Sequence, residues 1–119
     1  MKRDMEKVRQ ILIDLSKGTG KQSFFRNEED LEHFYHLEIM KDAGLITYRE
    51  ANTFERIVLY GVPKLTWSGN DYLDAISDDT MWNKTKEGIK EKGLELGSIP
   101  FGLLKDYAIQ TVKQRLGIE

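Results

Sequence analysis

The sequence predicts an α+β protein that is mainly helical, with helices and short strands alternating in residues 1–76 and helices alone in residues 77–119. Three observations support this prediction. Near the N-terminus, apolar residues recur at steps of three and four, the spacing of one face of an amphipathic helix. A second helical pattern ends at Gly44 and runs directly into the β-branched and aromatic segment LITY. After a further extended segment, capping residues and apolar spacing again favour helices.

The composition is typical of a soluble globular protein. Of 119 residues, 39% are hydrophobic and 32% are charged, with a formal net charge of −2, which is too apolar for a disordered chain. The absence of cysteine excludes disulfides and cysteine nucleophiles. The start, MKRDMEKVRQ, lacks the apolar stretch of a signal peptide, and no run is long enough to span a membrane. We therefore expect a cytoplasmic protein that makes no membrane contact.

Two helices and a brief strand are predicted in the first part of the chain. The first helix runs from Asp4, which can cap it, to Ser16. Its apolar face comprises Met5, Val8, Ile11, Leu12 and Leu15. The aromatic segment QSFFR (22–26) predicts a short strand, and a second helix covers residues 28–43. Acidic residues in the first turn of that helix suit the positive end of its dipole, and Gly44 closes it.

A two-stranded wing is predicted next. The segment LITY (45–48) forms one strand, REANTFE (49–55) a polar loop, and RIVLYGVPKLTW (56–67) a second extended run interrupted at Gly61 and Pro63. Three helices then follow, with caps assigned to Ser68, to Asp78 or Asp79, and to Ser98 with Pro100.

This order of elements matches a winged helix-turn-helix core over residues 1–76, with a C-terminal helical extension over residues 77–119 packed on it in a single domain. Leu12, Leu37 and Trp67 are predicted to be deeply buried, because each lies at a periodic or wing-closing position. Trp82 is predicted to be a further core residue.

Two segments resemble parts of winged-helix regulators. HLEIMKDAGLI (36–46) resembles their third helix and following strand, and PKLTWSGNDYLDAI (63–76) resembles the last wing strand and next helix. In that class a Leu-Thr pair closes the wing, and a glycine sits inside the following turn. The chain as a whole is similar to a family of small uncharacterised proteins of bacteria, phages and prophages, a domain of unknown function. The matching segments are Met1–Met5, Tyr35–Leu37, Ala43–Ile46 and Leu65–Lys84. The resemblance implies a winged-helix fold, and DNA binding follows from it only by analogy of fold.

No motif predicts an enzyme, a cofactor or a metal site. GTGKQS (18–23) is similar to the end of a phosphate-binding loop, but Leu15 stands where such a loop needs a glycine, so we interpret it as a turn. His33 and His36 lie one helical turn apart, yet no distinctive third ligand is nearby. Helix capping and solvent exposure account for the acidic cluster Asp71, Asp74, Asp78 and Asp79.

The helix over residues 28–43 is poorly suited to reading DNA. Residues 28–44 carry six acidic and one basic side chain, whereas residues 1–27 carry seven basic and three acidic ones. Carboxylates near phosphates are repelled, and reading helices usually offer Arg, Lys, Asn or Gln to the groove.

Two functions are therefore compatible with the sequence. The first is a DNA-binding or transcription-control protein of phage or prophage type, which contacts double-stranded DNA through cations outside the acidic helix. These are Lys2, Arg3, Lys21, Arg26, Arg49 and Arg56. The second is a protein–protein interaction module that binds a host or phage protein through Glu32, Tyr35, His36 and Ile39 of the acidic helix.

A homodimer is also expected, through an apolar stripe on the last helix. Its residues are Leu104, Tyr107, Ala108, Thr111 and Val112.

Overall fold

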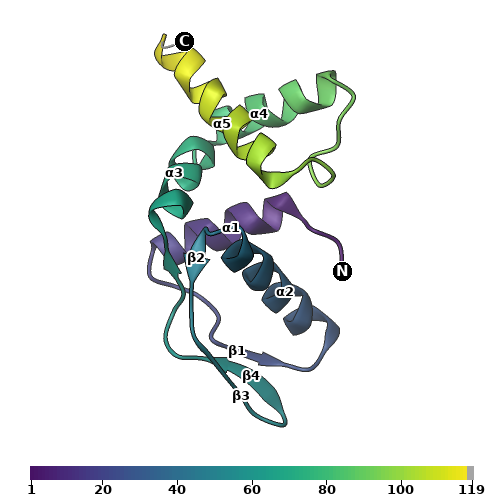
Figure 1. Ribbon diagram of the computed structural model, residues 1–119, viewed down its shortest axis with the longest axis vertical. Helices are drawn as coiled ribbons and strands as arrows, with labels where there is room; N and C mark the ends of the chain where they lie inside the picture. The colour runs from purple at the N-terminus through teal and green to yellow at the C-terminus, as the bar shows by residue number, and fades with distance from the viewer. Residues whose placement is uncertain (118–119) are drawn as a thin grey trace. The chain divides into compact units, whose positions relative to one another are not determined.

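The computed structural model describes residues 1–117 of the chain (Figure 1). It confirms an α+β protein, with five helices and two small antiparallel sheets in that range. The elements are α1 (Met5–Ser16), β1 (Ser23–Phe25), α2 (Glu28–Asp42), β2 (Ile46–Thr47), β3 (Glu50–Asn52), β4 (Arg56–Leu59), β5 (Lys64–Leu65), α3 (Trp67–Ile76), α4 (Asp79–Glu91) and α5 (Phe101–Leu116). The chain forms two compact units, Met1–Asn70 and Asp71–Glu119. The packing of the helical extension on the core stays a prediction.

Helix α1 forms as its sequence predicts. Asp4 Oδ1 accepts the backbone N–H groups of Glu6 and Lys7, which caps the helix, and all five residues of the predicted apolar face are buried. At the other end Gly18 adopts a φ of +75°, and the N–H of Thr19 donates to the carbonyl of Asp14. The GTGKQS segment therefore begins as a helix C-cap, and its Gly20 packs closely against Leu15.

Helix α2 buries one of its two apolar arcs. Asn27 caps it by accepting the N–H of Asp30. The arc of Phe34, Leu37 and Met40 lies in the core, which confirms the burial predicted for Leu37. The second arc is half-buried and consists of Leu31, Tyr35 and Ile39. The helix ends before Gly44, whose φ is +78°.

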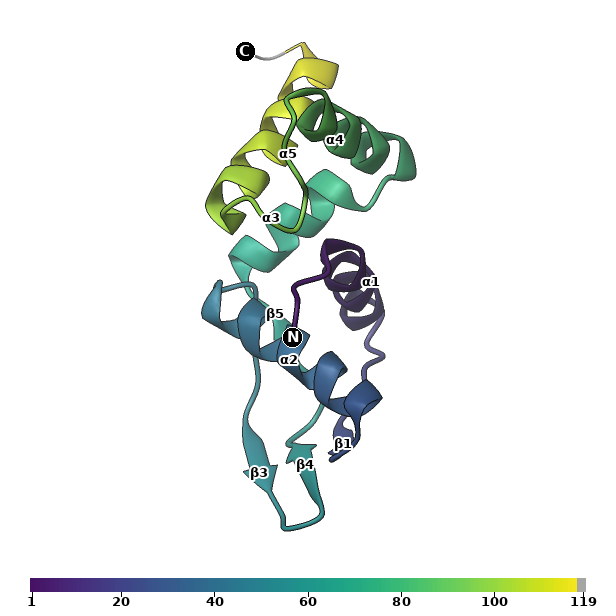
Figure 2. The ribbon, with the colours of Figure 1, turned by 90° about the vertical axis from the view of Figure 1, so that its right-hand side faces the viewer.

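The strands form two sheets where the sequence predicts a single two-stranded wing. Strand β2 pairs with β5, whereas β1, β4 and β3 form a second sheet in that order. Segment 49–55, predicted to be a loop, contains β3, and the run 56–67 is divided between the two sheets. The division falls at Gly61, whose φ of +84° turns the chain. As a result, the β3–β4 hairpin extends beyond the β2–β5 pair (Figures 1 and 2).

The junction between β5 and α3 explains the Leu-Thr and glycine positions of the wing-closing segment. Thr66 Oγ1 donates to the carbonyl of Gly44 and accepts the N–H of Gly69, and the N–H of Thr66 donates to the carbonyl of Leu45. A Cβ atom at Gly69 would collide with the Leu45 carbonyl oxygen. Thr66 therefore caps α3, and the cap assigned to Ser68 is wrong.

The burial predicted for Trp67 is also wrong, because Trp67 is 84% exposed. Trp67 is the first residue of α3. Thr66 and Gly69 lie on the side of the helix that faces Leu45, and a helix turns about 100° per residue, so Trp67 points away from that contact.

In the second unit, helices α4 and α5 pack against each other. Asp78 caps α4 by accepting the N–H of Met81, and Trp82 is buried as predicted. Gly88 permits the close packing, because a Cβ there would collide with the Tyr107 hydroxyl group. None of the helices in the described range is both long and apolar enough to cross a bilayer.

The stripe predicted for self-association is partly covered within one copy of the chain. Leu104 and Ala108 are buried, while Tyr107, Thr111 and Val112 are half-exposed. Exposed apolar surface on α5 comes instead from Leu103 and Leu116. Homodimer formation through α5 stays a prediction.

Candidate nucleic-acid interface

The outer face of the β1–β4–β3 sheet carries two arginine–aromatic pairs. Phe25 lies opposite Arg56 in the register of β1 and β4, and the guanidinium carbon of Arg56 is 5.8 Å from the centre of the Phe25 ring. The N–H of Tyr60 donates to the carbonyl of Arg49, whose guanidinium carbon is 6.0 Å from the Tyr60 ring. Both aromatic residues are exposed, at 51% for Phe25 and 69% for Tyr60. Their neighbours Phe24, Ile57 and Leu59 are buried on the other face of the sheet.

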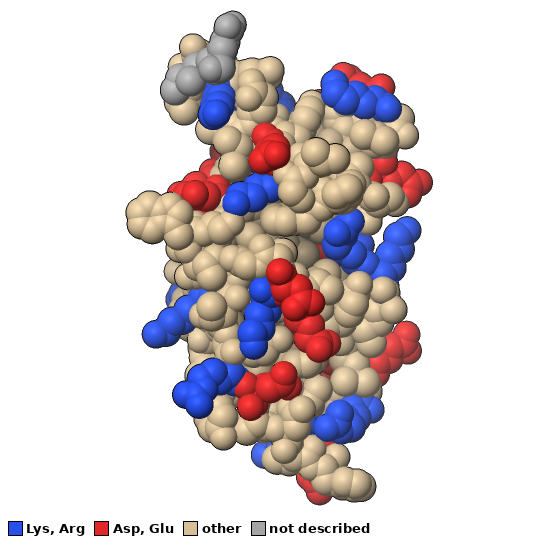
Figure 3. Space-filling model, in the orientation of Figure 1, with Lys and Arg blue, Asp and Glu red and all other residues tan. Residues whose placement is uncertain are grey.

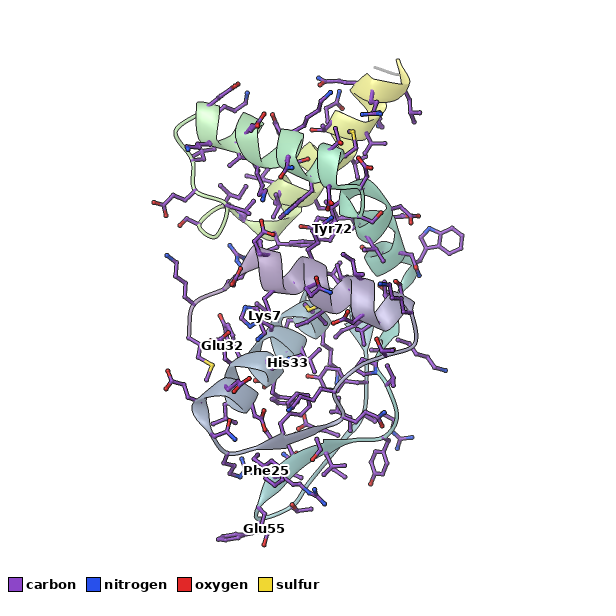
Figure 4. All side chains as sticks on the ribbon, turned by 180° about the vertical axis from the view of Figure 1, so that it is seen from behind. Lys7, Phe25, Glu32, His33, Glu55 and Tyr72 are labelled. Carbon is purple, nitrogen blue, oxygen red and sulfur yellow. The ribbon has the colours of Figure 1, made fainter. Side chains whose placement is uncertain are left out.

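The loop of the β3–β4 hairpin adds a third exposed aromatic residue. Phe54 is 98% exposed. Arg26 holds the loop, since its Nη2 donates to the carbonyl of Thr53 at 3.2 Å and its Nε to that of Phe54 at 3.4 Å. Phe25 lies near this end of the hairpin, close to the loop residue Glu55 (Figure 4). The hairpin thus presents apolar rings among arginines at its free end. We call the surface formed by Phe25, Arg26, Arg49, Phe54, Arg56 and Tyr60 the hairpin face.

Three of the six cations predicted to contact DNA lie on the hairpin face, and the other three do not. Lys2 and Arg3 precede α1, and Met1 beside them lines a groove on the opposite face of the sheet. Lys21 forms an ion pair with Asp30, with Nζ and Oδ1 2.9 Å apart. An arginine or lysine already paired with a carboxylate attracts phosphate less strongly, so Lys21 is a weaker candidate than the sequence suggests.

Asp30 is a buried carboxylate with a structural task. Its Oδ2 accepts the N–H of Phe25 at 2.8 Å, and its own N–H donates to Asn27. The hydrogen bond from Lys21, followed by that from the Phe25 N–H, lowers the pKa of Asp30 below its ordinary value. The carboxylate therefore fixes the start of α2 to strand β1, next to the Phe25 ring of the hairpin face.

The partner-binding residues predicted on α2 do not form one exposed surface. Glu32 is exposed but pairs with Lys7 of α1, with a distance of 3.5 Å between Oε1 and Nζ (Figure 4). Tyr35 and Ile39 are half-buried. His36, which the sequence suggests as a partner-binding residue, is fully buried, so it does not lie on an exposed surface of α2.

His36 is buried because both of its ring nitrogens have partners inside the protein. Nε2 accepts the N–H of Asp4 at 2.9 Å, so the proton lies on Nδ1, which donates to the carbonyl of Glu32 at 2.8 Å. The ring thereby joins the start of α1 to α2. A ring held in this way cannot act as a metal ligand with His33, and no group of three potential ligands within residues 1–117 is arranged to hold a metal.

His33 lies closer to the surface, in a positive environment. Its ring centre is 5.4 Å from that of Phe24. Burial, followed by the charges of Lys7 and Lys21, lowers the pKa of His33 below its ordinary value.

This lowered pKa predicts a dependence of stability on pH. As the pH falls below about 6.5, the ordinary histidine pKa, His33 takes up a proton in the unfolded chain before it does so in the folded protein. The free energy of unfolding should therefore decrease with falling pH from that point down to the folded-state pKa. Urea unfolding at a series of pH values tests this, and the His33→Gln variant should show a weaker dependence than the wild type. An equal dependence in both proteins would show that His33 does not contribute.

Acidic side chains gather on the face formed by α2 and β3. The pKa of Tyr48 is raised to about 12, first by burial and then by the negative charges of Glu38, Glu50 and Asp42. Burial also raises the pKa of Glu38, and repulsion from the charges of Glu50 and Asp42 raises it further. Figure 3 shows acidic side chains over the region of α2, with lysine and arginine around them. Such a face repels the phosphates of DNA.

Comparison with known proteins identifies the family. Residues 2–95 match a family described as "Hypothetical protein (DUF2513)". The chain belongs to this family. It is also 33% identical to a protein of Haemophilus influenzae titled "Uncharacterized protein", over 98% of this chain and 99% of that one. No solved structure matches significantly. Membership in a domain-of-unknown-function family, as the sequence motifs predicted, is confirmed.

The aromatic residues of the hairpin face were not singled out from the sequence. Each has an arginine close by in the chain or across a strand pair, as in Phe25-Arg26 and Phe54-Glu55-Arg56. An aromatic residue beside arginine in a short strand or polar loop is therefore the signal that could have found them.

Proposed function

We propose that this family member binds double-stranded DNA through the hairpin face. The observation that carries the proposal is the grouping of three arginines with three exposed aromatic rings on one sheet surface and its loop. Arginine supplies phosphate contacts, and an exposed phenylalanine at a hairpin tip is suited to the minor groove, where apolar side chains insert between base steps. With the resemblance to winged-helix regulators, this supports a role in transcription control of phage or prophage type.

In the proposed binding mode the hairpin face makes the main contact with DNA. Helices α1 and α2 are separated by residues 17–27, which contain β1, so the two do not form a tight helix-turn-helix. Helix α2 also carries acidic residues on its exposed side, including Glu32 and Glu38. A protein with this arrangement would approach DNA with the hairpin, and α2 would face away from the phosphates.

The proposal is tested by removing the two sheet arginines. Arg49→Ala combined with Arg56→Ala should weaken binding to duplex DNA of any sequence, and should make the dependence of log K on log salt shallower by up to about two units, since each phosphate contact contributes about 0.9. Fluorescence anisotropy with a labelled duplex at several salt concentrations measures both effects. Lys84→Ala combined with Lys90→Ala removes the same charge from α4, and should leave affinity nearly unchanged. Equal losses from the two double variants would contradict the proposal, as would undetectable binding near 50 mM salt, where phosphate contacts are strong.

A second pair of substitutions separates DNA binding from partner binding on α2. Glu32→Gln combined with Glu38→Gln should strengthen DNA binding slightly, because the protein loses two negative charges, whereas a protein bound at the acidic helix should lose affinity. If the same pair weakens DNA binding, the carboxylates themselves contact the bases and the hairpin face is not the main interface.

A further inference from the structure

A groove of about 460 Å³ lies between α2 and strand β3, on the side of the sheet opposite the hairpin face. Buried Phe34 and Ile57 lie at its base, and half-buried Leu31 and Tyr35 line it from α2. The groove therefore offers apolar surface beside a strand edge. The DNA contacts proposed above do not use it.

Strand β3 lies at one edge of its sheet, so the backbone groups on its outer side do not pair with another strand of that sheet. In the described sheet β3 pairs only with β4. The N–H of Tyr60 donates to the carbonyl of Arg49, and the N–H of Thr53 donates to the carbonyl of Arg56. The backbone N–H and C=O groups of Arg49, Ala51 and Thr53 therefore point toward β4. In an antiparallel ladder the intervening residues point the other way. The N–H and C=O groups of Glu50 and Asn52 therefore point away from β4.

The rim of the groove is acidic. Glu38 from α2 and Glu50 from β3 both line it. Repulsion from Glu50 contributes to the raised pKa of Glu38, so the two carboxylates lie close enough to interact unfavourably. A cationic side chain placed between them would relieve that repulsion.

We propose that the β3 edge and this groove bind an extended segment of a partner protein that carries lysine or arginine two positions away from a bulky apolar residue. The segment would add a strand to β3 through the backbone of Glu50 and Asn52, as in other cases of β-strand addition. Side chains two positions apart on a strand point to the same side. A basic and an apolar residue at that spacing would therefore both enter the groove, the first at Glu38 and Glu50 and the second at Phe34 and Ile57.

The test uses the full chain and a synthetic peptide, TRTLTRT, which places arginine, leucine and arginine on one side of a strand. Anisotropy of the labelled peptide should show binding, and ¹H–¹⁵N spectra should show shifts at Glu50, Asn52 and Ile57. Asn52→Pro removes an outward N–H without removing a bond to β4, and should weaken binding at least tenfold, whereas Asn52→Ala should retain it. Glu38→Gln with Glu50→Gln should also weaken binding at least tenfold. Thermal unfolding of each variant checks that it remains folded.

Three further measurements complete the test. The charge-reversed peptide TETLTET should not bind, and Arg49→Ala with Arg56→Ala should not weaken the binding of TRTLTRT, which separates this site from the DNA interface. Absence of TRTLTRT binding, or binding unaffected by Asn52→Pro and by the glutamate pair, would overturn the proposal. A dimer in sedimentation equilibrium that Asn52→Pro dissociates would overturn it too, because the edge would then belong to a second copy of the chain.

Discussion

Replacing Gly69 with alanine should destabilise the first unit by about 3 kcal/mol, within the upper range for forcing extra atoms into a packed site. The added Cβ would collide with the Leu45 carbonyl oxygen, a backbone atom that cannot rotate away. That same carbonyl accepts the N–H of Thr66, so moving it also strains the junction between β2 and α3. Urea unfolding followed by circular dichroism measures the loss.

Two comparisons isolate the cause. Gly102→Ala places the same substitution in α5, where nothing lies within 4 Å of the new Cβ, and should be neutral or stabilising by up to about 1 kcal/mol because alanine favours helix. Thr66→Val removes the hydroxyl that donates to Gly44 and accepts from Gly69, and should cost about 1–2 kcal/mol, the usual range for a cap. Thr66→Ser should restore most of that loss. A Gly69→Ala protein as stable as Gly102→Ala would show that the backbone at the junction can shift to accommodate the added Cβ.

The elements that the sequence predicted well depend on local signals. The face of α1 follows from its own spacing, and the caps at Asp4 and Asp78 act on N–H groups within three residues. The turn at Gly44 is likewise a local requirement for positive φ. Such features are set by neighbours in the chain, so they can be found from one sequence.

The features that the sequence did not reveal depend on distant partners. His36 is buried because the N–H of Asp4, 32 residues away, reaches its ring. Strand β3 has the sequence Glu-Ala-Asn, which does not favour extended structure, and it forms because β4 pairs with it. Trp67 sits in an apolar segment, but the contact between Gly69 and Leu45 turns it outward. The hairpin face could not be predicted from the sequence for the same reason, because its arginine–aromatic pairs join residues that are distant in the chain.

Leu37→Ala should have the other large effect on stability. Leu37 is 1% exposed and lies on the buried arc of α2. Large-to-small changes at such sites cost about 2–5 kcal/mol, and the cost rises with the volume of the cavity that stays open. A small cavity of about 30 Å³ already borders Leu37, with Ile11, Leu15 and Pro63 among its other walls. Truncation would enlarge this cavity, because α1 and the proline constrain its walls, so we expect a value in the upper half of the range.

The matched control is Ile39→Ala, which removes a similar side chain from the half-buried arc of the same helix. Both variants place alanine in the same helix, and the helix propensities of leucine and isoleucine differ by much less than the cost of a core cavity. Most of the difference in unfolding free energy between the two variants therefore reports the difference in burial. We expect Ile39→Ala to cost less than half as much as Leu37→Ala in urea unfolding. A cost for Leu37→Ala below about 0.5 kcal/mol, the level of an ordinary surface change, would mean that α2 presents a different face to the core. The groove beside β3 would then need to be reassigned as well, since its base includes Phe34, which lies on the same arc as Leu37.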